Sequence, residues 1–249
     1  MIAVLPKLPL TRAKMSACLG FKRFDGIVLC ADSAELDGFV KRKARKVRAF
    51  SLEGEWEVAV ALAGGKGLGD GFWGALKEEL GGDPFSEESV ITTKIERVLK
   101  IYVDKYGATD ETFRVLVAVH GCVLNPSLFC QTEAMLSPIE SAVAIGLGAD
   151  LCEFLLSTFD DVHSSVHNAE RLAVLIMSIL ADHVDGIDRP IHVAKYVDLL
   201  VKHIKGRESE PCGRFEIGDS DKIEKAARKI ADSGMRRVRD RLKLSTSRK

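Results

Sequence analysis

The chain has 249 residues, of which 46% are hydrophobic, and its formal net charge is zero. This apolar content is enough for one large buried core, and the length fits one domain or at most two. A neutral chain is not an obvious nucleic-acid binder. No apolar run reaches the ~18 residues that a membrane helix needs. We therefore expect a globular protein that binds neither membrane nor nucleic acid.

The compartment is predicted from the N-terminal sequence and the cysteines. The first apolar stretch is broken by Pro6, Lys7 and Pro9, unlike a secretion signal. None of the six cysteines forms a Cys-x-x-Cys pair, and most lie in apolar runs, as buried thiols do: Cys18, Cys30, Cys122, Cys130, Cys152 and Cys212. We predict a reducing, cytoplasmic compartment and no disulfide framework.

The first third of the chain predicts two hairpins followed by two helices. Ser16–Arg23 and Ile27–Asp32 are apolar runs around an Asp-Gly turn, which is a strong hairpin signal. Lys46–Leu52 and Trp56–Ala63 form a second such pair. The helices are expected over Phe72–Leu80 and over Glu87–Tyr106, the second with Ser86 as its N-cap.

The rest of the chain repeats this order of strands and then helices. Strands are expected at Phe113–His120, Ser127–Ala134 and Ser141–Ile145, helices at about Asp150–Phe159 and His167–His183, a late strand at Ile191–Val197, and a basic terminal helix at Asp221–Leu242. Strands joined as hairpins indicate antiparallel sheets. Helices that arrive in pairs indicate layers outside those sheets. The predicted fold class is therefore α+β.

Four local features in the first third of the chain form an ordered set of candidate site residues. A strand opens at Ser16, and the next strand ends in Ala31-Asp32. The segment Arg45-Lys46-Val47-Arg48 follows, and the strand after it runs through Ala63 into Gly64-Gly65. No single motif among them is specific, but the ordered set is moderately specific.

This ordered set resembles the proteasome β-subunit family of N-terminal-nucleophile (Ntn) hydrolases, and it looks closest to the bacterial HslV peptidase. The resemblance is good over about 16–80, weaker over 141–193 and absent over the tail. It implies a four-layer αββα sandwich of antiparallel sheets and a threonine-type endopeptidase that cleaves polypeptide substrates. It also implies a homo-oligomeric ring, an ATP-dependent unfoldase as a candidate partner, and no cofactor.

The resemblance also assigns roles to individual residues. Ser16 stands at the nucleophile position, where the family has Thr. Its own α-amino group, with a pKa of about 7.7–8.0 when free, would take the hydroxyl proton. Lys46 would keep the site positive and Asp32 would fix Lys46. The Gly64 N–H would form the oxyanion hole, and Asp182 would contact the N-terminal residue.

These roles need a free amine on Ser16, so residues 1–15 are predicted to be a leader or propeptide. Met15 replaces the usual Gly, and a translation start at Met15 would also expose Ser16 after methionine removal. Residues 16–205 are then the Ntn domain, and residues 206–249 are a basic helical extension. The extension is basic because residues 222–249 hold eleven Lys or Arg against three Asp or Glu.

Two other functions stay open. Leu147 replaces the serine of a supporting Gly-Ser-Gly turn, which favours a catalytically inactive structural subunit. An Ntn amidase that acts on small amides is also compatible, because this fold hosts both chemistries. The Gly69-x-Gly71-x-x-Gly74 pattern lacks the parallel βαβ unit of a dinucleotide site. The scattered histidines lack a zinc-helix pattern, so neither cofactor nor metal is expected.

Overall fold

The computed structural model describes residues 16–37, 40–52, 56–81, 87–106, 112–121, 126–160, 164–189, 191–197 and 215–219. The predicted leader 1–15, the Ser86 cap and the terminal helix Asp221–Leu242 lie outside these ranges.

Two five-stranded antiparallel sheets form the centre of the molecule. The first has the order β10 (Ala142–Gly146), β1 (Ala17–Arg23), β2 (Gly26–Ala31), β11 (His192–Val197) and β12 (Glu216–Asp219). The second has the order β5 (Val47–Leu52), β6 (Trp56–Gly64), β7 (Phe113–Gly121), β8 (Ser127–Thr132) and β9 (Met135–Ile139). The α+β class with antiparallel sheets is therefore confirmed.

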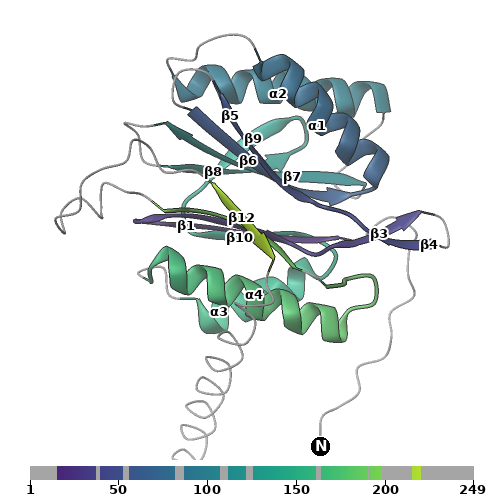
Figure 1. The fold of residues 1–249 in the computed structure, drawn as a ribbon, viewed down its shortest axis with the longest axis vertical. Coiled ribbons are helices and arrows are strands. Elements are labelled where there is room, and N and C mark those ends of the chain that lie inside the picture. The colour runs from purple at the N-terminus through teal and green to yellow at the C-terminus, as the bar shows by residue number, and fades with distance from the viewer. Residues whose placement is uncertain are drawn as a thin grey trace, which may run out of the picture.

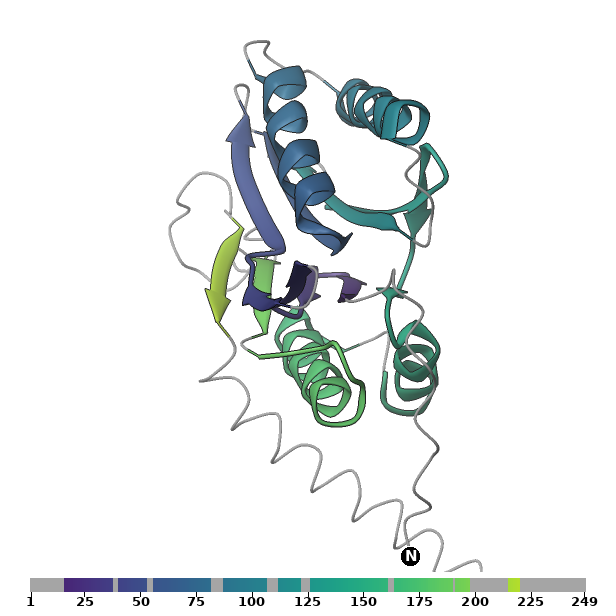
Figure 2. The same ribbon diagram turned by 90° about the vertical axis from the view of Figure 1, so that its right-hand side faces the viewer.

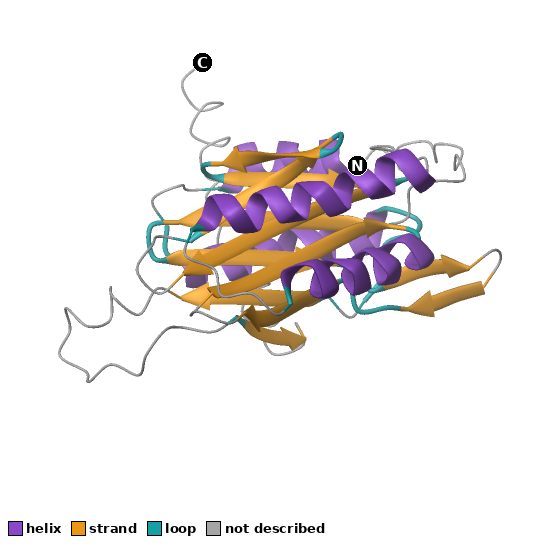
Figure 3. Cartoon of the chain, turned by 90° about the horizontal axis from the view of Figure 1, so that it is seen from above, coloured by secondary structure: helices purple, strands orange, loops and turns teal. Residues whose placement is uncertain are grey.

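Helices cover the outer face of each sheet. The helices α1 (Lys66–Leu80) and α2 (Glu88–Tyr106) lie on the second sheet, and α3 (Ala149–Phe159) and α4 (Val166–His183) lie on the first. Figure 1 shows the layers in the order helices, sheet, sheet, helices, and Figure 2 shows the same stacking from the side. Seen from above, the upper helices lie over the strands of the second sheet (Figure 3).

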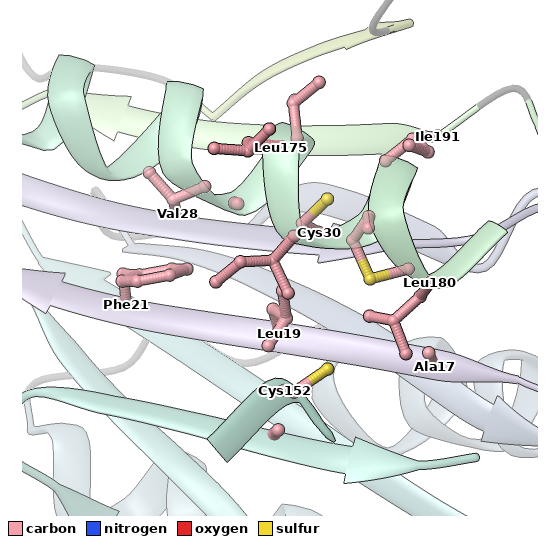
Figure 4. Packing of buried hydrophobic residues seen from close by; sticks show 14 of the residues in the cluster. Ala17, Leu19, Phe21, Val28, Cys30, Cys152, Leu175, Leu180 and Ile191 are labelled. Atoms are coloured by element: carbon pink, nitrogen blue, oxygen red, sulfur yellow. The ribbon is translucent and has the colours of Figure 1, made fainter. Parts of the chain in front are cut away.

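The molecule has three hydrophobic cores: one between each sheet and its helices, and one between the two sheets. Large and small residues alternate along the strands that separate these cores. In β6, Val58, Val60 and Leu62 face the helices α1 and α2, whereas Ala59, Ala61 and Ala63 face the other sheet. In β1, Leu19 and Phe21 pack against α3 and α4 (Figure 4). Cys18 faces the second sheet. Because successive strand residues point to opposite faces, this pattern gives each sheet a bulky helix face. The face between the sheets is rich in small residues, which lets the two sheets approach closely.

The first helix begins earlier than the sequence predicts. Helix α1 starts at Lys66, six residues before the expected Phe72, and includes four glycines. A glycine costs a helix interior about 1 kcal/mol, and this cost is offset by packing of Phe72, Leu76 and Leu80 against the second sheet. Gly71 lets the Tyr102 side chain of α2 approach α1 closely, because a Cβ at Gly71 would lie 2.6 Å from the Tyr102 hydroxyl.

Three strands of the structure, β9, β3 (Ala34–Asp37) and β4 (Val40–Lys43), were not predicted from the sequence. The expected strand Ser127–Ala134 ends at Thr132, and the chain turns at Glu133 (φ 56°) into β9. The largely exposed edge strand β9 contains Pro138 and has no continuous apolar pattern. The short hairpin of β3 and β4 projects beyond the sheets (Figure 1).

Strand β12 was also not predicted, and it lies in the range 206–249 that was expected to be a helical extension. It pairs with β11 as the edge of the first sheet. The N–H of Phe215, which precedes it, donates to the Glu57 carboxylate of β6 over 2.7 Å. This bond ties the edge of one sheet to the other.

Candidate active site

Ser16 lies immediately before β1 and is almost completely buried, with 2% exposure. Its carbonyl accepts the Leu147 N–H over 2.7 Å. Gly146 packs directly on this carbonyl, since a Cβ at Gly146 (φ +87°) would lie 2.0 Å from the Ser16 oxygen. The turn after β10 therefore fixes the backbone of Ser16, and Leu147 takes part through its main chain, not its side chain.

Lys46 reaches Ser16 from the other sheet. It precedes β5, and its Nζ donates to Ser16 Oγ over 2.7 Å. The same ammonium lies 3.0 and 3.1 Å from the two Asp32 carboxylate oxygens and also donates to the Ala34 carbonyl. The residue is 6% exposed. A buried ammonium needs such partners because desolvation penalises an isolated charge strongly.

Asp32 follows β2 and is fully buried. Its Oδ1 accepts the Ala17 N–H over 2.9 Å, and its Oδ2 accepts the Ala34 N–H over 2.8 Å. Burial raises the pKa of the Asp32 carboxyl, and the Lys46 charge and these two hydrogen bonds oppose that rise. Asp32 is thus held in one orientation that fixes Lys46 against Ser16.

Gly64 lies beside this cluster, at the end of β6. Its φ of +139° places it against β7, and a Cβ there would lie 2.4 Å from the Thr112 carbonyl. Gly64 and Lys46 both line a small open pocket. The pocket therefore lies next to the Ser16–Lys46 contact, although Ser16 itself is not among its lining residues.

The structure does not bring Asp182 into this cluster. Asp182 lies in the last turn of α4 and pairs with Arg189 over 3.1 Å, with 56% of its side chain exposed. Its predicted contact with the N-terminal residue stays a prediction. Ala34 is a further residue of the cluster that was not predicted, and it contributes an N–H to Asp32 and a carbonyl to Lys46. Backbone groups carry no signal in the residue pattern, so nothing in the sequence could have marked it.

Two other kinds of site have no support in the described part of the chain. No group of three His, Cys, Asp or Glu side chains there could hold a metal ion. No helix among the described residues is long and apolar enough to cross a membrane.

Several solved structures that resemble this chain are Anbu (ancestral beta-subunit) proteins. An Anbu (Gly-1) mutant from Hyphomicrobium sp. strain MC1 matches with a TM-score of 0.73 and 14% identity, over 92% of this chain and 96% of that one. The Anbu complex from Pseudomonas aeruginosa, solved as a helical assembly, matches with a TM-score of 0.67 and 16% identity. This match covers 90% of this chain and 96% of that one. Anbu from Yersinia bercovieri matches with a TM-score of 0.65 and 15% identity, over 73% of this chain and 82% of that one.

No protein-family model and no curated protein matches the chain. At these identities the likeness shows the fold alone, which is the proteasome-like fold of the Anbu structures. The resemblance to the proteasome β-subunit and HslV peptidase family was wrong at the level of the family, because the similar structures are Anbu proteins. The ATP-dependent unfoldase partner was expected from that resemblance and stays an expectation.

Proposed function

We propose that this chain is an Anbu-like Ntn subunit that hydrolyses peptide bonds through Ser16. The observation that carries the proposal is the contact of 2.7 Å between Lys46 Nζ and Ser16 Oγ, with Asp32 holding Lys46 in place. A hydroxyl that is paired with a buried cation can develop negative charge at lower cost. The fold of the Anbu structures supports the same assignment.

In the proposed reaction, removal of residues 1–15 exposes the α-amino group of Ser16. This amine takes the proton from Oγ as Oγ attacks the substrate carbonyl carbon. Lys46 stabilises the developing alkoxide, and the Gly64 N–H donates to the carbonyl oxygen as it becomes an oxyanion. The amine then gives the proton to the departing nitrogen, and water hydrolyses the Ser16 ester.

The assembly and location are part of the same proposal. We propose that the chain self-associates, as the helical Anbu assembly from Pseudomonas aeruginosa does. Negative-stain microscopy of the purified protein would distinguish a closed ring from an open helix or a monomer. The four described free cysteines support a reducing, cytoplasmic location.

The test combines the N-terminal sequence of the purified protein with acylation of its nucleophile. We expect the mature chain to begin at Ser16, and a peptide-based electrophile to label Ser16, as located by mass spectrometry. Ser16→Ala should abolish this labelling. The control Ser178→Ala removes another buried serine, on α4, and should leave the labelling unchanged.

An inactive structural subunit is the second candidate, and the burial of Ser16 favours it. A purified chain that keeps residues 1–15 and shows no labelling at Ser16 would support this second function and contradict the first. If such a protein still self-associates, this result would support a structural role within an assembly.

A further inference from the structure

The pocket beside the site has an unusual set of charges. It is lined by residues from the segment before β5, the start of β5, the end of β6 and the start of α1: Ala44, Arg45, Lys46, Arg48, Leu62, Gly64, Gly65, Gly69 and Asp70. Lys46 and Gly64 belong both to this pocket and to the proposed catalytic site. A substrate whose carbonyl carbon lies at Ser16 Oγ, with its oxygen at the Gly64 N–H, would therefore direct a neighbouring side chain into the pocket.

Arg48 and Asp70 form a fixed pair in the wall of the pocket. Arg48 Nη2 donates to Asp70 Oδ1, and Arg48 Nε donates to the Arg45 carbonyl over 3.1 Å. The Arg48 guanidinium also lies 5.8 Å from the centre of the Trp73 ring. These three contacts hold the guanidinium in place, so that its charge is matched by Asp70.

Arg45 supplies the charge that is not matched. Lys46 is paired with Asp32 and Arg48 with Asp70, whereas the Arg45 side chain is exposed and forms no ion pair with any side chain that the structure describes. The pocket therefore has a net positive potential. The rest of its lining carries no charge and consists of Ala44, Leu62 and three glycines.

The geometry points to a pocket that selects an acidic side chain next to the scissile bond of the substrate. This inference rests on the proposed function, since it assumes that the acyl group of the substrate is bound at Ser16. A carboxylate in the pocket would be attracted to Arg45 and could share the outer N–H groups of Arg48. A lysine or arginine side chain would meet the same positive potential and be repelled.

The test compares peptides that differ only at the residue before the cleaved bond: Glu, its neutral isostere Gln, and Lys. For the full chain we expect kcat/KM for Glu to exceed that for Gln by roughly 5-fold, because a partly exposed charge pair contributes modestly. The Glu-to-Gln ratio should fall as salt is added, because salt screens exposed charges.

Two variants should move this ratio in opposite directions. Arg45→Glu reverses the unmatched charge and should bring the Glu-to-Gln ratio below one. Asp70→Asn frees Arg48 and should raise the ratio a few-fold. The matched control Arg171→Glu makes the same charge change on the exposed face of α4, in the opposite helix layer, and should leave the ratio unchanged.

The outcomes separate this inference from the proposed function. Hydrolysis with a Glu-to-Gln ratio near one, or with the same ratio in Arg45→Glu, would overturn the acidic preference and leave the peptidase function standing. If no peptide is hydrolysed and Ser16 is not labelled, the proposed function fails. In that case, calorimetric binding of the same peptides tests the acidic preference of the pocket. Equal affinity for the Glu and Gln peptides would overturn that preference too.

Discussion

Lys46 is the residue through which the two sheets meet at the candidate site. It precedes a strand of the second sheet, whereas Ser16 and Asp32 flank strands of the first. The sequence marked all three residues, although Lys46 lies in a basic run that is more often a solvated surface. Its burial and its contact with Ser16 follow from the packing of the sheets, which the residue pattern alone does not encode.

Removing the Lys46 charge should destabilise the protein as well as abolish its activity. Lys46→Met leaves the Asp32 carboxyl buried without a cation, which typically costs about 3–5 kcal/mol. The double variant Lys46→Met/Asp32→Asn removes both charges and should recover most of that loss. Urea denaturation at neutral pH would measure both effects, and equal stability of the two variants would contradict a buried ion pair.

The same two variants should respond differently to pH. Burial already raises the pKa of Asp32, and loss of Lys46 removes an opposing influence, so the folded-state pKa lies above the unfolded one. A raised carboxyl pKa means that stability is fully present below the unfolded pKa and is lost as pH rises through the folded pKa. The stability of Lys46→Met should fall by about 1.4 kcal/mol per pH unit across that window, measured by denaturation from pH 4 upward. The double variant should show no such slope.

At the scale of elements, the buried pair Arg23–Asp160 joins the first hairpin to the end of α3. Arg23 ends β1, its side chain is fully buried, and its guanidinium donates to Asp160 and to the Ser141 carbonyl. Asp160 is also the C-cap of α3, where its N–H donates to the Leu156 carbonyl over 2.8 Å. One contact therefore fixes the position of a helix relative to its sheet.

The Arg23–Asp160 pair should matter far more than an exposed one. Asp160→Ala leaves a buried guanidinium uncompensated and should cost about 3–5 kcal/mol of unfolding free energy. Arg97→Ala breaks the pair with Glu79, in which the Arg97 side chain is 62% exposed, and should cost about 0–1 kcal/mol. Chemical denaturation of both variants would check this, and similar losses would show that burial of the first pair is not decisive.

At the scale of the whole molecule, the close approach of the sheets depends on the small residues between them. Ala59, Ala61 and Ala118 are fully buried in this layer together with Leu116 and Leu128. A Cβ at Gly20 of β1 would already lie 3.2 Å from Leu116 and Leu128. Lys46 reaches Ser16 across this layer, so the packing between the two sheets, which begins beside Lys46 at Ala61, sets the spacing of the site.

Enlarging a residue in this layer should affect both stability and the site. Ala118→Leu adds volume to a closely packed interface and should cost about 1–3 kcal/mol, measured by denaturation. It should also slow the labelling of Ser16, because the sheets must separate to accommodate it. The control Ala134→Leu, in the β8–β9 turn, should change neither, and an unchanged labelling rate in Ala118→Leu would contradict the link between sheet spacing and the site.

The sequence by itself determined the elements whose signal is local. The hairpin at Asp25-Gly26, the helices α3 and α4, and the long apolar strands β1, β2, β6 and β7 follow from turn residues and apolar periodicity, which neighbouring residues decide. Strand β9 and the early start of α1 lacked that signal, since an exposed edge strand and a glycine-rich helix are stabilised by contacts with distant segments.

Only the tertiary structure decided how the site is assembled. Ser16, Asp32 and Lys46 could be named from the sequence, but the structure showed that they share one buried set of hydrogen bonds completed by the backbone of Ala34. It paired Asp182 with Arg189 instead, and it placed Arg45, Arg48 and Asp70 around one pocket. The physical reason is that burial and charge pairing depend on how the two sheets stack, and stacking is a property of the whole chain.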